Sequence, residues 1–279
     1  GWSSFQGFDT YEDTGTTGID TLKAIGDGAV DIGLKKFDAS SGIEVIDGTG
    51  AKGAVRLVGD DSASLFDFRT TKFVGSNLSI DGGNGNDTIK GSAGNDIMLG
   101  GRNNDILLGS DGTDKLDGGE GDDILLDNAG KNDVLIGGVG RDRLVVGHSG
   151  KSQVDLWGGS TDAKDATSDT FGILNSSTAI DVVAIIHDFE WGKDKLDFSQ
   201  LRAADNYALN MDDLTIKQSG NDTIVTLAQG VHTLDGASVQ AQFILQNINL
   251  LTASDFAFAE SQLPSGMPGI IHTFPDLFF

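Results

Sequence analysis

The chain has 279 residues, enough for one elongated domain or two small ones, and a formal net charge of −23. This charge argues against nucleic acid as a partner, and the absence of cysteine excludes disulfides and thiolate metal sites. No apolar run approaches the roughly 18 residues that would span a membrane. All but five of the 42 acidic residues are aspartate, and the 40 glycines stand against three prolines. This composition is typical of many tight turns rather than of a disordered linker.

The N-terminal part of the chain has only a weak pattern up to residue 42, and we assign residues 1–42 to a cap or linker. Within it, Val30–Leu34 alternates apolar and polar side chains, which predicts a strand. From 43 to 81, short apolar segments start every 10–13 residues, and most of them end in glycine and aspartate turns. These segments predict wider coils of a solenoid, whose terminal repeats are expected to be atypical because they close the core.

Between Gly82 and Val145 the sequence repeats with a basic period of nine residues. Each unit has a glycine-rich half followed by a three-residue strand with one central apolar side chain, such as Ile89. We expect a six-residue turn to reverse the chain after each strand, so that two units make one coil and the coils stack around a narrow core. The seven units carry an aspartate at the sixth position, or the seventh in one longer unit: Asp87, Asp96, Asp105, Asp114, Asp123, Asp133 and Asp142.

This period predicts two columns of carboxylates, because alternate units fall on opposite edges of the solenoid. Adjacent strands lie about 4.8 Å apart, so stacked anions would repel unless a cation lies between them. Calcium accepts six to eight carboxylate and carbonyl oxygens in a forgiving geometry. Glycines before each aspartate permit positive φ and close approach of the backbone to a ligand. The predicted metal site therefore includes, besides the seven aspartates, Gly83, Gly85, Gly94, Gly112, Gly119, Gly121, Gly138 and Gly140.

The first unit, Gly82–Lys90, reads GGNGNDTIK and matches the nonapeptide G-G-x-G-x-D-x-U-x. The array resembles the repeats-in-toxin (RTX, hemolysin-type) family, which implies a right-handed parallel β-roll that holds several calcium ions between turns on the same edge. Some units depart from the pattern, at Ser92, Asn103 and Ser110. The sixth unit, 127–136, lacks the glycine pair and has one extra residue, so we expect the calcium sites beside it to be weaker or absent.

After the array the repeats fade, and we divide the remaining chain into a β-roll that ends at residue 159, a cap over 160–258 and a tail over 259–279. The apolar segments 214–217, 223–227 and 243–245 predict an antiparallel cap. The predicted fold class is thus all-β, a right-handed parallel β-roll or β-helix solenoid with a C-terminal antiparallel β cap. The stretch 181–199 resembles the segment that closes β-rolls in the same family.

No catalytic motif is found, since the four histidines form no H-E-x-x-H pattern and Gly147–Lys151 does not match G-x-S-x-G. We therefore expect no enzyme activity but a secreted bacterial calcium-binding module that folds on extracellular calcium. One alternative is a non-catalytic C-terminal module of a secreted polysaccharide-modifying enzyme or protease. Another is a calcium-dependent adhesin, S-layer or filament subunit. Extracellular polysaccharide and self-association are thus the candidate partners besides calcium.

The two chain ends bear on export. Gly1–Ser4 shows no basic head or apolar run of a signal peptide. The resemblance implies an uncleaved C-terminal signal read by a type I secretion channel. Asp276–Phe279, an acid followed by three apolar residues, is similar to such signals. The expected location is extracellular or at the cell surface.

Overall fold

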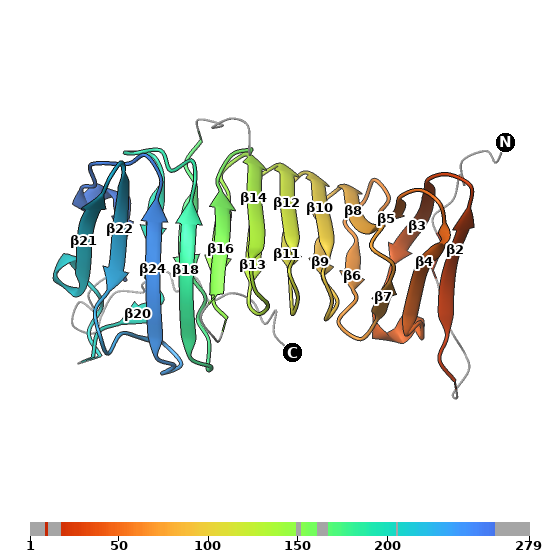
Figure 1. Cartoon of the computed structure of the whole chain (residues 1–279), viewed down its shortest axis with the longest axis horizontal. Helices are drawn as coiled ribbons and strands as arrows, with labels where there is room; N and C mark the ends of the chain where they lie inside the picture. The colour runs from red at the N-terminus through yellow and green to blue at the C-terminus, as the bar shows by residue number, and fades with distance from the viewer. Residues whose placement is uncertain (1–8, 11–17, 149–151, 161–166, 205, 260–279) are drawn as a thin grey trace, which may run out of the picture.

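The computed structural model describes residues 9–10, 18–148, 152–160, 167–204 and 206–259. The predicted secretion signal at Asp276–Phe279 and residues 1–8 lie outside these residues. The strands stack side by side along one long axis, with the N-terminal strands at one end and the C-terminal strands at the other (Figure 1). In the described part, no helix is both long and apolar enough to cross a membrane.

Two long sheets make up most of the molecule. The first has the order β1 (Asp9–Thr10), β3 (Val30–Lys36), β5 (Val55–Val58), β8 (Leu78–Asn84), β10 (Ile97–Arg102), β12 (Lys115–Glu120), β14 (Asp133–Val139), β16 (Ser152–Trp157), β18 (Ile180–Ile186), β24 (Val239–Leu245), β22 (Asp222–Leu227), β21 (Leu214–Ser219). The second has the order β25 (Phe256–Ala257), β19 (Lys195–Asp197), β17 (Thr170–Ile173), β15 (Arg143–Val146), β13 (Ile124–Asp127), β11 (Ile106–Leu108), β9 (Thr88–Lys90), β6 (Leu65–Asp67). From β8 to β19 the chain alternates between these sheets, and the pairs from β1 to β24 in the first and throughout the second are parallel. The predicted parallel β-roll is confirmed.

A third face exists only in the N-terminal part. It is a parallel sheet of β2 (Thr21–Gly26), β4 (Val45–Ala51) and β7 (Lys72–Val74). Each coil there has three sides and a wider interior, which large aromatic rings fill: Phe68 stacks on Phe37 at 4.7 Å and meets Phe73 edge-on at 5.1 Å. These phenylalanines are therefore core residues. The division of the chain into segments stays a prediction.

Beyond β7 the coils have two sides, and a single line of aliphatic side chains fills each half of the core. On the second sheet Ile89, Leu107, Leu125 and Leu144 pair in register and are fully buried. On the first sheet Ile80, Met98, Leu116 and Leu135 do the same. One apolar residue per strand is thus enough to close this narrow core.

The turns differ between the two edges, which corrects the expectation of a six-residue turn in every unit. At one edge three residues link the strands, as between β8 and β9; at the other, six residues link β9 to β10. The difference arises because the glycine pairs at the first edge remain in the sheet, where Gly83 pairs with Gly101 and Gly101 with Gly119. A Cβ on Gly101 would lie 2.1 Å from the Gly83 carbonyl oxygen, so only glycine permits this approach.

The C-terminal strands form the expected antiparallel cap. β24 continues the parallel ladder beside β18, and then β22 and β21 add to it antiparallel. β20 (Leu201–Arg202) and β23 (His232–Thr233) form a separate antiparallel pair. Three short 3₁₀ turns complete the described structure: Ala39–Ser41, Met211–Asp213 and Ala253–Asp255.

Truncating Leu125 to alanine should lower the free energy of unfolding of the calcium-saturated protein by about 2–5 kcal/mol, because it leaves a cavity in a core one residue wide. The same truncation at Leu65, which is 40% exposed, should cost about 1 kcal/mol or less. Denaturant titrations of both variants in saturating calcium measure the difference. Equal losses would contradict the single-file core.

Candidate metal centre

The aspartates of the repeats form the two predicted columns, and a regular hydrogen bond connects their members. In the first column the Asp87 N–H donates to Asp105 Oδ1 at 2.7 Å, and the Asp105 N–H donates to Asp123 Oδ1 at 2.7 Å. Asp123 donates in the same way to Asp142, at 2.8 Å. Each carboxylate therefore satisfies the backbone of the preceding coil on the same edge.

The second column runs along the other edge with the same bond. The Asp96 N–H donates to Asp114 Oδ1 at 2.9 Å, and the Asp114 N–H donates to Asp133 Oδ1 at 2.7 Å. The sixth unit thus keeps its aspartate in the column in spite of the extra residue. The assignment of alternate units to opposite edges agrees with these bonds.

The first column is longer than the repeats suggest. The Asp142 N–H donates to Asp169 Oδ1, and the Asp169 N–H donates to Asp194 Oδ1, both at 2.9 Å. At the other end the Ser64 N–H donates to Asp87 Oδ1 at 2.7 Å. Sequence reasoning missed Asp169 as a column member because 27 residues separate it from Asp142.

Asp188 and Asp197, which lie near Asp194 in the sequence, have other partners. Asp188 accepts the N–H groups of Gly158 and Gly159 at 2.9 and 2.8 Å. Asp197 pairs with Arg143 at 2.8 Å. Only Asp194 of these three therefore joins the column through its carboxylate.

The second carboxylate oxygen is the chemically notable part of each column. In the described part of the chain this atom is buried and has no hydrogen-bond partner in Asp87, Asp105, Asp114, Asp123 and Asp133. In all of these except Asp133, whose unit begins with Asp127, the atom lies against the first glycine of its own unit: a Cβ added to Gly100 would come within 2.5 Å of Asp105 Oδ2. The first glycine is thus needed to make room for the carboxylate, a role that the predicted set of site glycines does not include.

The predicted site glycines lie in the turns that carry the carboxylates or, for Gly83, Gly119 and Gly138, near the end of the strand before such a turn. Seven of them have φ between 96° and 145°, and Gly94 is not among the residues with positive φ. Asn103, at a glycine position of the third unit, has φ 73°, a conformation that asparagine tolerates. The set with positive φ is Gly83, Gly85, Gly112, Gly119, Gly121, Gly138 and Gly140.

The second unit differs because the serine at its second position bonds to its own aspartate, whereas the hydroxyl of Ser110, at the same position of the fourth unit, has no hydrogen-bond partner among the described residues. The Ser92 N–H donates to Asp96 Oδ2 at 2.7 Å, and the Ser92 hydroxyl lies 3.0 Å from Oδ1. Asp96 therefore has local partners for both oxygens, unlike Asp105 or Asp114. Ser92, which departs from the repeat pattern, therefore changes the hydrogen bonding of Asp96, the first member of the second column.

Burial makes these carboxylates hard to ionise. It raises the pKa of Asp105 to about 7, with a further contribution from the charges of Asp123 and Asp87. Burial likewise raises the pKa of Asp114 to about 8, with Asp96 and Asp133 adding to it. An isolated buried carboxylate costs several kcal/mol, so a column of them requires either protons or a bound cation.

The donors in the columns fit calcium. They are carboxylate oxygens with glycine carbonyls close by, and hard cations prefer such oxygen ligands. The close stacking lets one ion contact two successive coils, and calcium tolerates irregular ligand sets better than magnesium does. Buried oxygens without a hydrogen-bond donor are the observation of this structure that supports the fit.

Comparison with known proteins agrees with this geometry. A family model described as the RTX calcium-binding nonapeptide repeat matches residues 79–107, 99–130 and 108–144. Residues 79–144 are therefore an array of RTX repeats, a type of repeat that binds calcium ions. The array covers every column aspartate that was predicted from the sequence.

The likeness to solved structures is weaker than the match to the family model. The chain is similar to the solution structure of the AlgE6R3 subunit from the Azotobacter vinelandii mannuronan C5-epimerase, at 23% identity and a TM-score of 0.34. The matched region covers 66% of this chain and 89% of that one. No curated protein sequence matches the chain.

The calcium-free protein should hold more strand structure at pH 5.5 than at pH 8.5. The column carboxylates have folded-state pKa values of about 6 to 8, above the ordinary value of 3.8. Each contributes stability that is fully present below 3.8 and lost as the pH rises through its folded value, because the folded state binds more protons in that range. Circular dichroism of calcium-stripped protein across this range is the measurement.

A matched pair of variants separates this effect from general charge repulsion. Asp114→Asn should raise the strand signal of calcium-free protein at pH 8.5, since the neutral side chain mimics the protonated acid. Asp111→Asn removes the same charge from an exposed residue and should change little. An equal gain in both variants would show that net charge, rather than the column, sets the pH dependence.

Proposed function

We propose that this chain is an extracellular calcium-binding module whose repeat array folds when its carboxylate columns bind calcium. The observation that carries the proposal is the row of buried, unpartnered Oδ2 atoms in successive coils, with Asp105 and Asp123 as neighbours in one column. These oxygens have lost their water and have gained no donor in exchange. Bound calcium supplies the positive charge that offsets the repulsion between ionised carboxylates in successive coils.

The ligands that we propose come from both edges. The aspartates supply one carboxylate on each edge of a coil, while their other oxygen holds the preceding coil at 2.7–2.9 Å. The glycines at the second and fourth positions supply backbone carbonyls, since they permit the turn and expose the peptide groups. The proposed set is Asp87, Asp96, Asp105, Asp114, Asp123, Asp133 and Asp142, with Gly83, Gly85, Gly94, Gly112, Gly119, Gly121, Gly138 and Gly140.

The same physics favours an extracellular setting. Calcium sites in extracellular modules have dissociation constants of about 10⁻⁴–10⁻³ M, far above cytosolic calcium. In the cytosol the columns would lack their cation, and like charges would oppose closure of the coils. Outside the cell millimolar calcium would fill them. Coupling of folding to calcium thus lets the chain remain open during export and fold on arrival.

The array should be largely unfolded in chelator at pH 8 and should fold cooperatively on addition of calcium in the millimolar range. The reason is that a core one residue wide cannot outweigh the repulsion within two carboxylate columns. Circular dichroism in chelator and during calcium titration measures the transition, with magnesium at equal concentration as the control. Full strand signal in chelator, or equal folding with magnesium, would contradict the proposal.

Individual aspartates should differ in their importance. Asp105→Ala or Asp123→Ala should weaken calcium binding about tenfold or more, since a charge-assisted contact is worth about 1.5–3 kcal/mol. Asp133→Ala should weaken it less, because Asp133 belongs to the irregular unit. All three variants remove one bond to a preceding backbone N–H, so the comparison is matched. Calcium titration calorimetry decides, and equal losses would show that the sixth unit binds calcium like the others.

A further inference from the structure

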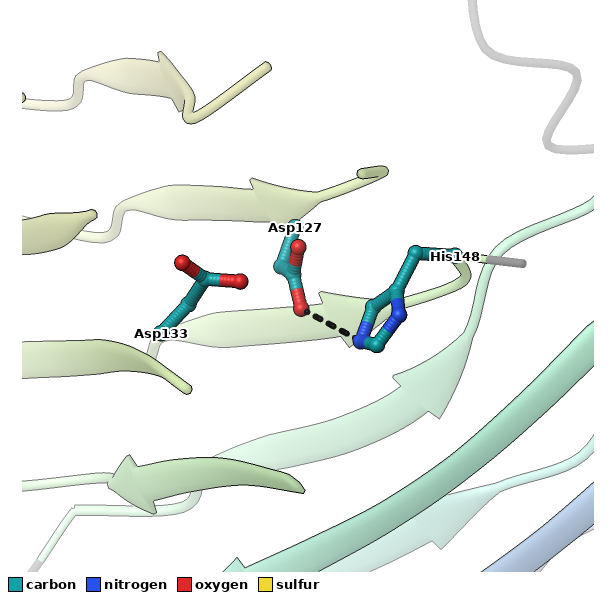
Figure 2. A group of neighbouring side chains, drawn as sticks. All are labelled: Asp127, Asp133 and His148. Carbon is teal, nitrogen blue, oxygen red and sulfur yellow. Dashed lines mark ion pairs between the residues drawn. The ribbon is translucent and has the colours of Figure 1, made fainter. Parts of the chain in front are cut away.

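The irregular sixth unit brings together three buried side chains from different parts of the array (Figure 2). Asp127 ends β13, Asp133 begins β14, and His148 follows β15. Each is at most 2% exposed. Their candidate ligand atoms all lie within 4.8 Å of one another, and His148 Nε2 is 3.2 Å from Asp127 Oδ2.

This cluster replaces the regular continuation of the second column. Asp127 stands at the first position of its unit, where the other six units have glycine. One coil later, Val154 is in register with Asp133, so the second column has no carboxylate at that position. The second column thus ends in a group that adds a carboxylate and an imidazole nitrogen. Such a donor set differs from the all-oxygen set of the regular coils.

The charge of the cluster is the second observation that points to a ligand. Asp133 Oδ2 is buried without a hydrogen-bond partner, and the Asp133 carboxylate points toward Asp127 in Figure 2. Two facing buried carboxylates carry a charge of −2, and one protonated imidazole would leave −1. A divalent cation bound to two carboxylates and a neutral imidazole leaves no net charge, which avoids the large cost of buried uncompensated ions.

The nitrogen donor decides which cation fits. Calcium and magnesium take oxygen ligands, whereas imidazole suits zinc and the neighbouring transition metals. Zinc binds histidine nitrogen and carboxylate oxygen at about 2.0–2.2 Å, which places neighbouring ligand atoms about 3.4 Å apart in a tetrahedral shell. The pair of Asp127 and His148 is already near that spacing at 3.2 Å, and the upper limit of 4.8 Å leaves at most about 1.4 Å to close.

We propose that Asp127, Asp133 and His148 form a site for a divalent transition metal, zinc foremost, at the end of the second column, with which it shares Asp133. The site would tie β13, β14 and the residues after β15 to one another where the repeat array gives way to the C-terminal coils. Because an imidazole is among its donors, its preference for zinc does not depend on the calcium proposal.

The test uses the full chain without any affinity tag, stripped of transition metals and kept in saturating calcium. Zinc titration calorimetry should show one tight equivalent that excess calcium does not displace. Cobalt(II), as a spectroscopic substitute, should give visible absorption bands that report nitrogen and oxygen coordination. Absence of a zinc equivalent, or its loss as calcium is raised, would overturn the proposal, the latter because zinc would then be occupying a calcium site.

Variants then locate the site. His148→Gln and Asp133→Asn should each lose the tight zinc equivalent and the cobalt bands. His187→Gln is the matched control, because His187 is also paired with a carboxylate, at 2.8 Å from Asp155, yet lies outside the cluster. Retention of zinc binding in His148→Gln, or its loss in His187→Gln, would contradict the assignment.

A measurement on the unaltered protein covers the case in which a variant fails to fold. Anomalous diffraction at the zinc edge, from crystals grown with both metals, should place a single zinc peak between Asp127, Asp133 and His148. A peak elsewhere would overturn the proposal. Calcium-dependent folding is followed separately by circular dichroism, so failure of the zinc site is distinguishable from failure of the calcium proposal.

Discussion

The hydrogen bond that each column carboxylate accepts from a backbone N–H of the preceding coil is the interaction on which the structure depends. It places Oδ1 of each column aspartate 2.7–2.9 Å from a backbone nitrogen of the preceding coil, and the whole carboxyl group is thereby buried. The other oxygen is then buried as well, without a donor. One contact therefore both aligns successive coils and buries an oxygen without a donor, so in the proposed function folding and calcium binding share the same atoms.

The width of the coil determines where such columns can exist. Three-sided coils near the N-terminus enclose enough volume for stacked phenylalanines such as Phe37 and Phe68. Their core can draw on large apolar side chains, each of which contributes more buried area than a leucine does. In the two-sided coils one aliphatic residue per strand faces the interior, while Leu108, Leu126 and Val145 are buried in a separate, smaller cluster. In the proposed function, calcium binding stabilises the coils whose interior holds these smaller apolar side chains.

Irregular units mark changes of chemistry along an otherwise uniform array. Ser92 supplies local hydrogen bonds to Asp96 near the start of the second column. At its far end, the sixth unit exchanges a glycine for Asp127, which meets His148. In a solenoid each coil contacts only its neighbours, so a single unit can change its ligand set without disturbing the coils further away.

Much of this arrangement follows from the sequence alone. The nine-residue period predicted the parallel roll, because two units make one coil and one apolar side chain per strand faces inward, as Leu107 and Leu125 do. The same period predicted which aspartates share an edge. These features are visible in sequence because they repeat at a constant short spacing, and each is decided by residues within one coil.

Contacts between residues at irregular spacings were decided only by the tertiary structure. Asp169 and Asp194 continue the first column across spacings of 27 and 25 residues, which hide the register. The continuation of strand pairing through Gly83 and Gly101 depends on the close approach of two coils, which no local pattern encodes. Asp127 and His148 lie 21 residues apart in different units, and they meet because stacking places successive coils in contact. A repeat pattern describes the coils that obey it, whereas contacts at the exceptions depend on how the chain stacks.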